Sequence, residues 1–178
     1  MPTPKRTMRG FTLIEQVVVV AVFVTLVGVG TPALARLFKR SAVQVAETEL
    51  VGALHYARAT AVQANTRSVL CPSVDGRQCS PGIDWRHGWI IGYDRDRDGQ
   101  PDGTILTAGG PLPEAVVIRG SGARRVIRFG AEGGAPGSNM SLLICRRGRT
   151  DGARRVVLSS TGRVRLDDAS AARAKACL

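Results

Sequence analysis

Residues 9–26 read RGFTLIEQVVVVAVFVTL, and this stretch decides the architecture of the chain. From Phe11 to Ala35 the only charged side chain is Glu15. A helix of about 20 apolar residues crosses a bilayer, so a plain membrane anchor accounts for the length of the run. It does not account for Glu15, because a charged side chain without a partner near the bilayer centre costs roughly 3 kcal/mol on insertion scales.

A secretory signal peptide is one alternative for this segment. Basic residues precede Gly10, an apolar run follows, and the small-residue sequence ALA at 33–35 has the character of a cleavage site. This alternative predicts an ordinary exported protein that is cut after Ala35. Its apolar core would be unusually long, however, and would still contain Glu15.

A third interpretation accounts for the glutamate. Residues 10–15, GFTLIE, follow a short basic leader and precede the apolar run, and this arrangement resembles the class III signal of type IV prepilins. The resemblance implies that a prepilin peptidase in the membrane cuts after Gly10 and that Phe11 becomes the N-terminus, which in this family is usually methylated. Glu15 then neutralises the amine of a neighbouring subunit in a filament, since a buried charge is tolerated once it is paired.

Residues 41–65 continue with the pattern of an amphipathic helix. Apolar side chains recur at steps of three and four residues; they are Val43, Ala46, Leu50, Leu54, Ala57 and Ala61. Asn65 and the change of pattern after it predict the end of the helix. Together with the apolar run, this segment predicts one helix of roughly 50 residues, about 75 Å long.

Beyond this helix, short β-type runs alternate with clusters of Gly, Pro, Asp and Ser, as in antiparallel strands and hairpins. The runs are Ser68–Cys71, Gly88–Tyr93, Thr104–Thr107, Ala115–Arg119, Arg125–Phe129, Ser141–Cys145, Arg155–Ser159 and Arg163–Leu166. The pattern predicts an α+β fold in which a long N-terminal helix packs on a small antiparallel sheet. The expected segments are a leader at 1–10, a hydrophobic transmembrane or filament-core helix at 11–38, an amphipathic helix at 39–66 and a β-rich domain at 67–178.

The four cysteines indicate two disulfide bonds, because an even number of cysteines in a chain with an export-like N-terminus is typical of an oxidising compartment. Three pairings are possible. We favour Cys71–Cys79 and Cys145–Cys177, since the first two cysteines lie eight residues apart around the turn-rich sequence PSVDGRQ.

The positive charge of the chain is concentrated near its C-terminus. The 178 residues carry a net charge of +11. Residues 119–178 contain 13 basic and 4 acidic side chains, a net of +9, whereas residues 41–118 contain 6 basic and 9 acidic side chains, a net of −3. This asymmetry indicates a polyanionic partner for the C-terminal part. The alternative is that arginine serves only as a solvated surface residue.

Several later blocks resemble the FimT/GspH group of minor pilins and pseudopilins. They are CPSVDGRQC, WRHGWIIGYDRDRDG, SLLICRRG and RRVVLSSTGRVRL, which together with the prepilin motif cover most of the chain. Residues 162–165, Gly-Arg-Val-Arg, match the G-R-x-R element associated with DNA binding in FimT-type competence pilins. Carried over residue by residue, the resemblance implies that Gly162 shapes a turn and that Arg163 and Arg165 hold phosphates.

The period of a β-strand agrees with this role, because alternation turns Arg163 and Arg165 outward. The same alternation turns Val164 and Leu166 inward. Each guanidinium can bind a phosphate through a fork of donors. Further candidates for the same basic patch are Arg146, Arg147, Arg149, Arg154 and Arg155. Aromatic residues are few, so DNA binding should be electrostatic, salt-sensitive and nearly independent of sequence.

The stretch DRDRDGQPD at 94–102 has the D-x-D-x-D-G spacing of calcium loops. Its candidate ligands are Asp94, Asp96, Asp98 and Asp102. The twelfth position of an EF-hand loop would be Ile105, which supplies no bidentate carboxylate. Arg95 and Arg97 lie between the acids and are able to pair with them. We therefore expect a polar loop without a metal ion, and no other cofactor.

The motifs of common hydrolases are missing, since neither G-x-S-x-G nor H-E-x-x-H occurs, and we expect no enzymatic activity. The patterns instead predict a minor type IV pilin of FimT type, held in the inner membrane by one helix with its C-terminal domain in the periplasm. It later packs among major and minor pilins in a pilus at the cell surface and binds DNA for uptake in natural transformation. The alternative is a structural minor pilin, or a GspH-like pseudopilin of type II secretion, that helps to initiate or cap the filament without binding DNA.

Overall fold

The computed structural model describes residues 12–122 and 125–178, and within residues 29–41 it describes the course of the helix but no side chains. The expected cleavage site, Gly10 and Phe11, lies outside the described residues. The roles of these two residues in processing therefore stay predictions.

The chain forms two compact units, which divide between Arg40 and Ser41. One helix, α1, spans Leu13–Gln63 and contains 51 residues, which confirms the single long helix predicted from the sequence. Glu15 lies in its first turn, where the positive end of the helix dipole favours a negative charge. Within the described residues, no helix combines the length and the hydropathy that a membrane span requires.

The apolar stripe of α1 that follows Ser41 is buried, as its periodicity predicts. The exposed fraction of each side chain in the stripe is at most 6%. The helix ends near Asn65, which has a positive φ of 47°, a left-handed conformation that asparagine tolerates better than most residues. The Thr66 N–H then donates to the Ala61 carbonyl at 3.1 Å and closes the helix end.

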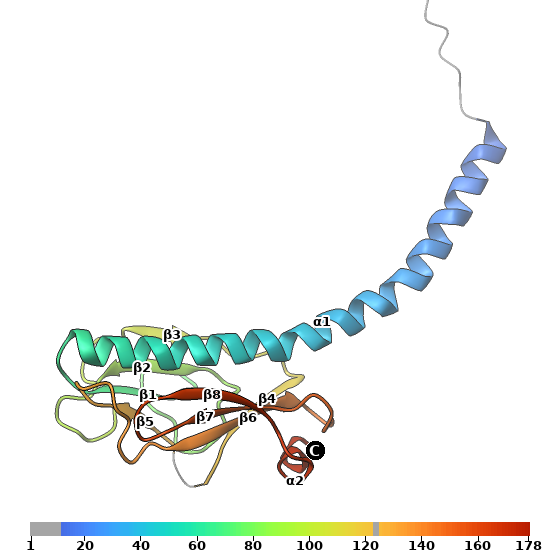
Figure 1. The fold of residues 1–178 in the computed structure, drawn as a ribbon. Helices are drawn as coiled ribbons and strands as arrows, with labels where there is room; N and C mark the ends of the chain where they lie inside the picture. Colours follow the sequence, from blue (N-terminus) through green and yellow to red (C-terminus); the bar gives the residue numbers. More distant parts are fainter. Residues whose placement is uncertain (1–11, 123–124) are drawn as a thin grey trace, which may run out of the picture. The chain divides into compact units, whose positions relative to one another are not determined.

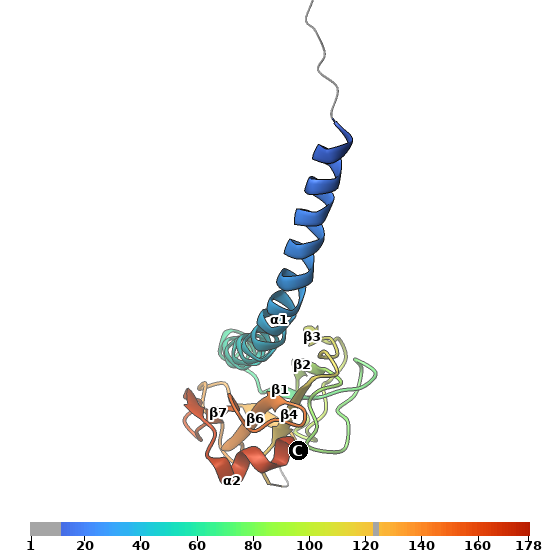
Figure 2. The same ribbon diagram turned by 90° about the vertical axis from the view of Figure 1, so that its right-hand side faces the viewer.

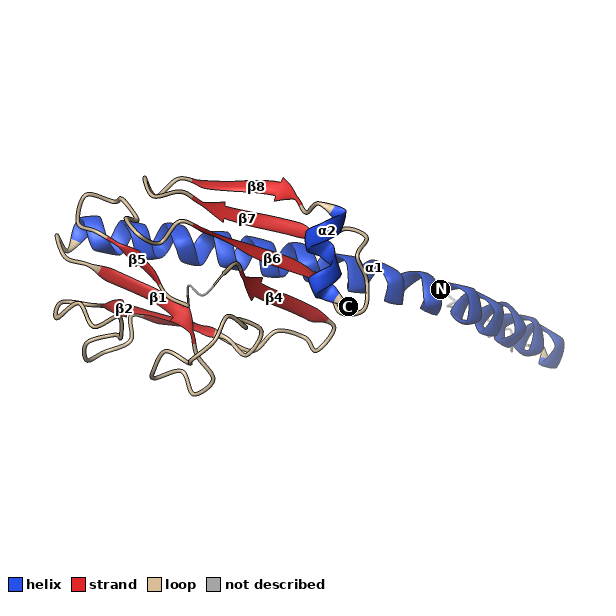
Figure 3. Cartoon of the chain, turned by 90° about the horizontal axis from the view of Figure 1, so that it is seen from below, coloured by secondary structure: helices blue, strands red, loops and turns tan. Residues whose placement is uncertain are grey.

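Two four-stranded antiparallel sheets follow the helix, where the sequence predicted one small sheet (Figures 1 and 3). The first sheet has the order β3-β2-β1-β5 and consists of β1 (Ser68–Pro72), β2 (Trp89–Tyr93), β3 (Thr107–Gly109) and β5 (Ile127–Phe129). The second has the order β4-β6-β7-β8 and consists of β4 (Val116–Gly120), β6 (Met140–Arg146), β7 (Arg154–Leu158) and β8 (Val164–Asp168). The α+β class is confirmed. The strands form two sheets because β5 pairs with β1 as an edge strand of the first sheet, whereas β4 pairs with β6 as an edge strand of the second.

A core of apolar side chains joins the globular part of α1 to one face of each sheet. It contains the helix stripe together with large buried residues such as Leu70, Phe129 and Ile144. Figure 2 shows a short C-terminal helix, α2 (Ala171–Ala174), on the side of the sheets that faces away from this part of α1. This helix and the following 3₁₀ turn, Lys175–Cys177, are too short to be predicted from periodicity.

A smaller apolar cluster lies on the opposite face of the second sheet, against α2. Its buried members are Val117, Leu143, Cys145, Ala153, Ala174 and Cys177. We call this the outer face of the second sheet, and the face that contacts α1 the inner face. Because side chains alternate along a strand, Leu142 and Ile144 belong to the inner face and Leu143, between them, belongs to the outer face.

One prediction about the strands is wrong. The strand expected at Thr104–Thr107 lies at β3, Thr107–Gly109, because the ladder with β2 begins only there. Leu166 lies on the inner face as predicted, because it pairs with Val156, but it is 45% exposed, since β8 is an edge strand of its sheet. Val164 does pack against the core. The other seven predicted strands overlap with observed ones.

Candidate functional site

The turn between β7 and β8 carries the residues that the sequence assigns to DNA binding. Gly162 has a φ of +78°, and its N–H donates to the Ser159 carbonyl at 3.0 Å. A Cβ atom at this position would overlap the carbonyl oxygen of Gly133. Both the backbone conformation and the available space therefore require glycine at the tip of the turn.

The turn is held in place from two sides. Arg58 Nη1, from α1, donates to the Gly162 carbonyl at 3.2 Å. The Ala135 N–H, from the loop after β5, donates to the Ser160 carbonyl at 2.7 Å. These bonds fix the backbone from which the two arginines of the G-R-x-R element project.

Arg163 and Arg165 carry the unpaired charge of this turn. Both side chains are exposed, and within the described part of the chain neither guanidinium forms an ion pair. Arg163 lies directly before β8, and its carbonyl accepts from the Ser159 N–H at 3.0 Å, which continues the ladder between β7 and β8. Arg163 and Arg165 therefore share a face and lie about 6.6 Å apart along the chain. Two guanidinium forks at this spacing are able to bind neighbouring phosphates.

The arginines of β7, by contrast, are paired with acids. Arg154 Nε donates to Glu47 Oε2 of α1 at 3.0 Å, and Arg154 also donates to Asp168. These hydrogen bonds, above all the one to Glu47, raise the pKa of Arg154 above its ordinary value. Arg155 Nη2 donates to Asp167 Oδ2 at 2.8 Å. The charge of both arginines is therefore compensated within the domain.

The arginines at the end of β6 and just after it also contact acids. Arg146 Nη2 and Arg149 Nε lie 2.9 and 2.7 Å from oxygens of Asp151. The hydrogen bond from Arg149 lowers the pKa of Asp151 below its ordinary value. Arg147 Nη1 lies 3.9 Å from Glu114 Oε1, which is a weak contact between exposed groups. Each candidate expected to extend the basic patch thus has an acidic partner, although Arg146 and Arg149 share one carboxylate. This pairing across strands and loops cannot be read from the sequence.

Two disulfide bonds link Cys71 to Cys79 and Cys145 to Cys177, with Cα–Cα distances of 5.5 and 6.1 Å. This is the pairing that the sequence favours. The second bond joins β6 to the C-terminal 3₁₀ turn, where the Gly148 N–H also donates to the Cys177 carbonyl at 2.8 Å. It therefore holds α2 against the outer face of the second sheet.

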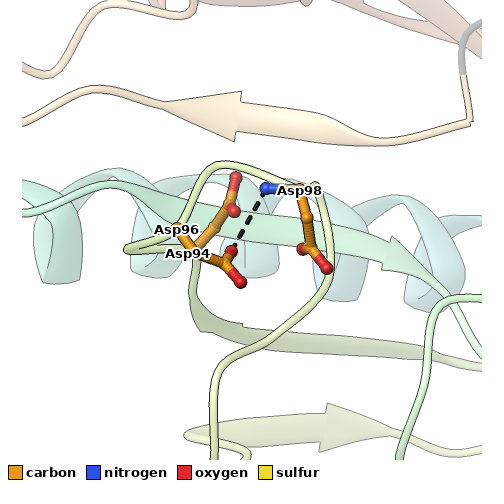
Figure 4. A group of neighbouring side chains, drawn as sticks. All are labelled: Asp94, Asp96 and Asp98. Carbon is orange, nitrogen blue, oxygen red and sulfur yellow. Dashed lines mark hydrogen bonds between the residues drawn. The ribbon is translucent and has the colours of Figure 1, made fainter.

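Three of the four predicted calcium ligands lie together in the loop after β2 (Figure 4). One carboxylate oxygen from each of Asp94, Asp96 and Asp98 lies within 4.8 Å of the other two. The Asp98 N–H donates to Asp96 Oδ1 at 3.2 Å, drawn as a dashed line in Figure 4. Asp102 is not part of this group, because its carboxylate accepts from the Arg95 N–H instead.

The charge of Asp94 is offset by arginines that sequence reasoning missed. Asp94 is fully buried, and its Oδ2 lies 3.9 Å from Arg67 Nη1 and 3.7 Å from Arg128 Nε. Arg95, which the sequence places among the partners of the acids, instead lies over the Tyr93 ring, 5.0 Å from its centroid. Only the pairing of β1 with β2 and β5 brings the two true partners to this loop.

The family model described as type II transport protein GspH matches residues 46–162. The matched region runs from the buried stripe of α1 through both sheets and ends at Gly162. Arg163 and Arg165 lie beyond it, so the match covers the scaffold of the turn but not the arginines that it presents.

Solved structures of pilins share this fold. Two crystal forms of the type IV minor pilin FimU from Pseudomonas aeruginosa are each 26% identical to this chain. One covers 75% of this chain and 92% of FimU with a TM-score of 0.60, and the other covers 74% and 93% with a TM-score of 0.55. The minor pseudopilin EpsH from the type 2 secretion system of Vibrio cholerae is 13% identical, covers 71% of this chain and 96% of EpsH, and has a TM-score of 0.51. No curated protein sequence matches the chain.

Proposed function

Since the chain belongs to the family of type II transport proteins GspH, we propose that it is a minor pilin that binds DNA through the turn between β7 and β8. Its place among minor pilins and pseudopilins is supported by the family match and by the similarity to FimU. The finer assignment, a DNA receptor for natural transformation, rests on the chemistry of the turn.

Assembly uses the N-terminal segment. Residues 11–38 hold the precursor in the inner membrane with its C-terminal domain in the periplasm, a prepilin peptidase cuts after Gly10, and Glu15 then meets the new amine of a neighbouring pilin. Mass spectrometry of the mature N-terminal peptide tests this. We expect Phe11, methylated, as the first residue. A mature chain that starts after Ala35 would instead identify an exported protein cleaved by signal peptidase.

One observation supports DNA binding above the others. The five other arginines of the predicted patch have acidic partners, whereas Arg163 and Arg165 have none among the described residues. A guanidinium that is exposed and unpaired can exchange its counterion for a phosphate without breaking an internal ion pair. The turn that presents both arginines is fixed by its bonds to α1 and to the loop after β5.

The predicted mode of binding is electrostatic. Aromatic residues make up 4% of the chain, so base stacking contributes little and the sequence of the DNA matters little. The affinity should fall as salt rises, with a slope of about −0.9 in log K against log [salt] for each phosphate contacted.

The test is fluorescence anisotropy with a labelled DNA duplex of random sequence, over a salt series, using the full chain in a non-ionic detergent. The variant is Arg163→Ala/Arg165→Ala, and the matched control is Arg146→Ala/Arg149→Ala, which removes the same charge from arginines paired with Asp151. We expect the turn variant to bind roughly tenfold more weakly, with a slope shallower by about 1.8. The control should bind nearly as well as wild type.

Two results would overturn the DNA proposal. The first is that wild type binds no DNA even at low salt, and the second is that the control loses as much affinity as the turn variant. The structural alternative would then replace it, in which the chain helps to initiate or cap a filament, as a GspH-like pseudopilin of a type II secretion system. The family match supports that alternative equally.

We further infer that the loop of Asp94–Asp102 works without calcium. Arg67 and Arg128 already offset the charge of Asp94, and Asp102 is engaged by the backbone. Isothermal titration calorimetry with calcium at millimolar concentration should give only the heat of dilution, the same for wild type and Asp96→Asn/Asp98→Asn. A saturable heat in wild type that the variant lacks would show a calcium site.

A further inference from the structure

The strand register places Arg165 at one end of a row of residues on the outer face of the second sheet. Arg165 pairs with Val157 of β7, which in turn pairs with Ser141 of β6. Directly opposed residues in a sheet share a face. Arg173 of α2 reaches this row, because its Nη1 donates to Ser141 Oγ at 3.3 Å. Arg165 and Arg173 therefore lie on the same side of the sheet.

The next row of the same face contains two more arginines. It runs from Asp167 of β8 through Arg155 of β7 and Leu143 of β6 to Arg119 of β4. Arg119 is exposed. Leu143 belongs to the apolar cluster against α2, which confirms that this row lies on the outer face and not on the face that contacts α1.

A hollow of about 320 Å³ lies on the outer face. Arg119, Arg155 and Arg173 line it, and among the described residues no acidic side chain does. Arg119 and Arg173 form no ion pair within the described part of the chain. Arg155 is paired through Nη2 with Asp167. The positive charge that is free to attract an anion into the hollow therefore comes from Arg119 and Arg173.

The hollow and the turn are close enough to contact one DNA molecule. Neighbouring strands lie about 4.8 Å apart, so the three strand intervals from β8 to β4 span about 14 Å. Arg165 and the row of Arg119 differ by two residues along the strand, which adds about 7 Å. The two displacements combine to a distance of about 16 Å. This is somewhat more than the width of the DNA major groove, about 12 Å, so one duplex can contact both the turn and the hollow.

We propose that the outer face continues the DNA-binding surface of the turn, with Arg119 and Arg173 as additional contacts to backbone phosphates. This inference rests on the proposed function, because the same duplex must also contact Arg163 and Arg165. It adds residues from β4 and α2 that the G-R-x-R element does not include.

The disulfide between Cys145 and Cys177 has a defined role in this surface. The helix that carries Arg173 has only four residues, too few to be stable by itself. It is held by the buried side chains of Ala174 and Cys177 and by the disulfide to β6. The disulfide therefore positions Arg173, whereas Arg119 is positioned by the strands of the sheet.

The experiment compares Arg119→Ala/Arg173→Ala with Arg95→Ala/Arg97→Ala in the same anisotropy assay on the full chain. Arg95 and Arg97 are also exposed and form no ion pair in the described structure, but they follow β2 in the other sheet. We expect the outer-face variant to bind roughly tenfold more weakly with a salt slope shallower by about 1.8, and the control to keep the slope of wild type.

The outcomes separate the two proposals. If wild type binds, the turn variant fails and the outer-face variant behaves like the control, this inference is overturned while the proposed function stands. If both double variants lose affinity equally, binding follows net charge alone and the outer face is not a site. If wild type does not bind DNA, the proposed function is overturned together with this inference.

A double-mutant cycle tests the role of the disulfide. In wild type, Arg119→Ala and Arg173→Ala should each weaken binding. In the Cys145→Ser/Cys177→Ser background, Arg173→Ala should have no further effect, whereas Arg119→Ala should keep its effect. An equal effect of Arg173→Ala in both backgrounds would show that the disulfide does not position this residue.

Discussion

The inner and outer faces of the second sheet are built from the same strands, yet they differ in what covers them. On the inner face, Leu142, Ile144 and Leu158 are buried against α1 in one continuous core. On the outer face, α2 covers one end, and the exposed Arg119 and Arg165 lie among half-buried residues of the sheet. One face therefore provides the stability of the domain, while the other is free to carry charge.

The largest effect should come from truncating the inner face. Ile144 is fully buried, and its replacement by alanine leaves a cavity, so Ile144→Ala should lower the free energy of unfolding by about 4 kcal/mol. Val157, on the outer face, is only half-buried, and Val157→Ala should cost about 1 kcal/mol. Urea unfolding followed by circular dichroism measures both. Equal losses would show that the outer face also forms a core.

Removal of the disulfide on the outer face should have the next largest effect. Cys145 and Cys177 are 32 residues apart, and by loop-closure entropy the Ser/Ser variant should lose about 3.5 kcal/mol. The control is Cys71→Ser/Cys79→Ser, whose cysteines are 8 residues apart, and it should lose about 2.5 kcal/mol. The prediction is that the Cys145→Ser/Cys177→Ser variant loses more stability than the Cys71→Ser/Cys79→Ser variant. The first variant should also bind DNA more weakly, because α2 is released from the sheet.

The turn that joins β7 to β8 should be sensitive to one added methyl group. Gly162→Ala combines a positive φ with overlap at the Gly133 carbonyl, and should cost at least about 2 kcal/mol. Gly137 also has a positive φ, of 73°, but its Cβ position is open, so Gly137→Ala should cost about 1 kcal/mol. Thermal unfolding of the two variants separates the overlap from the backbone conformation, and equal shifts in Tm would remove the overlap as a cause.

Substitutions of single arginines should have the smallest effect on stability, and they should differ from one another in their effect on DNA affinity. Arg154 bonds to Glu47 on the inner face, and Arg154→Ala should cost about 1 kcal/mol of stability with little change in DNA affinity. Arg163→Ala should cost less than about 0.5 kcal/mol but should weaken DNA binding. Measuring both properties on both variants tests whether paired and unpaired arginines have separate roles. If Arg154→Ala weakens DNA binding as strongly as Arg163→Ala, pairing does not distinguish them.

Much of the architecture follows from local patterns in the sequence. The apolar run and the stripe from Val43 to Ala61 specify a long helix, because the period of a helix is a local property of the chain. The positions of strands and turns can also be predicted, since β-type runs alternate with Gly- and Asp-rich segments. Gly162 could be singled out for the same reason, because a turn between two strands is encoded within a few residues.

Which arginines lack an acidic partner depends on the folded arrangement of the chain. The sequence makes Arg154 and Arg155 candidates for the same basic patch as Arg163, but Glu47 and Asp167 reach these two from α1 and β8. It also gives no sign that Arg119 and Arg173 share a face with Arg165, because strand register and the Cys145–Cys177 bond bring them together. Charge compensation depends on distance in space, and residues far apart in the chain become neighbours only when the strands pair.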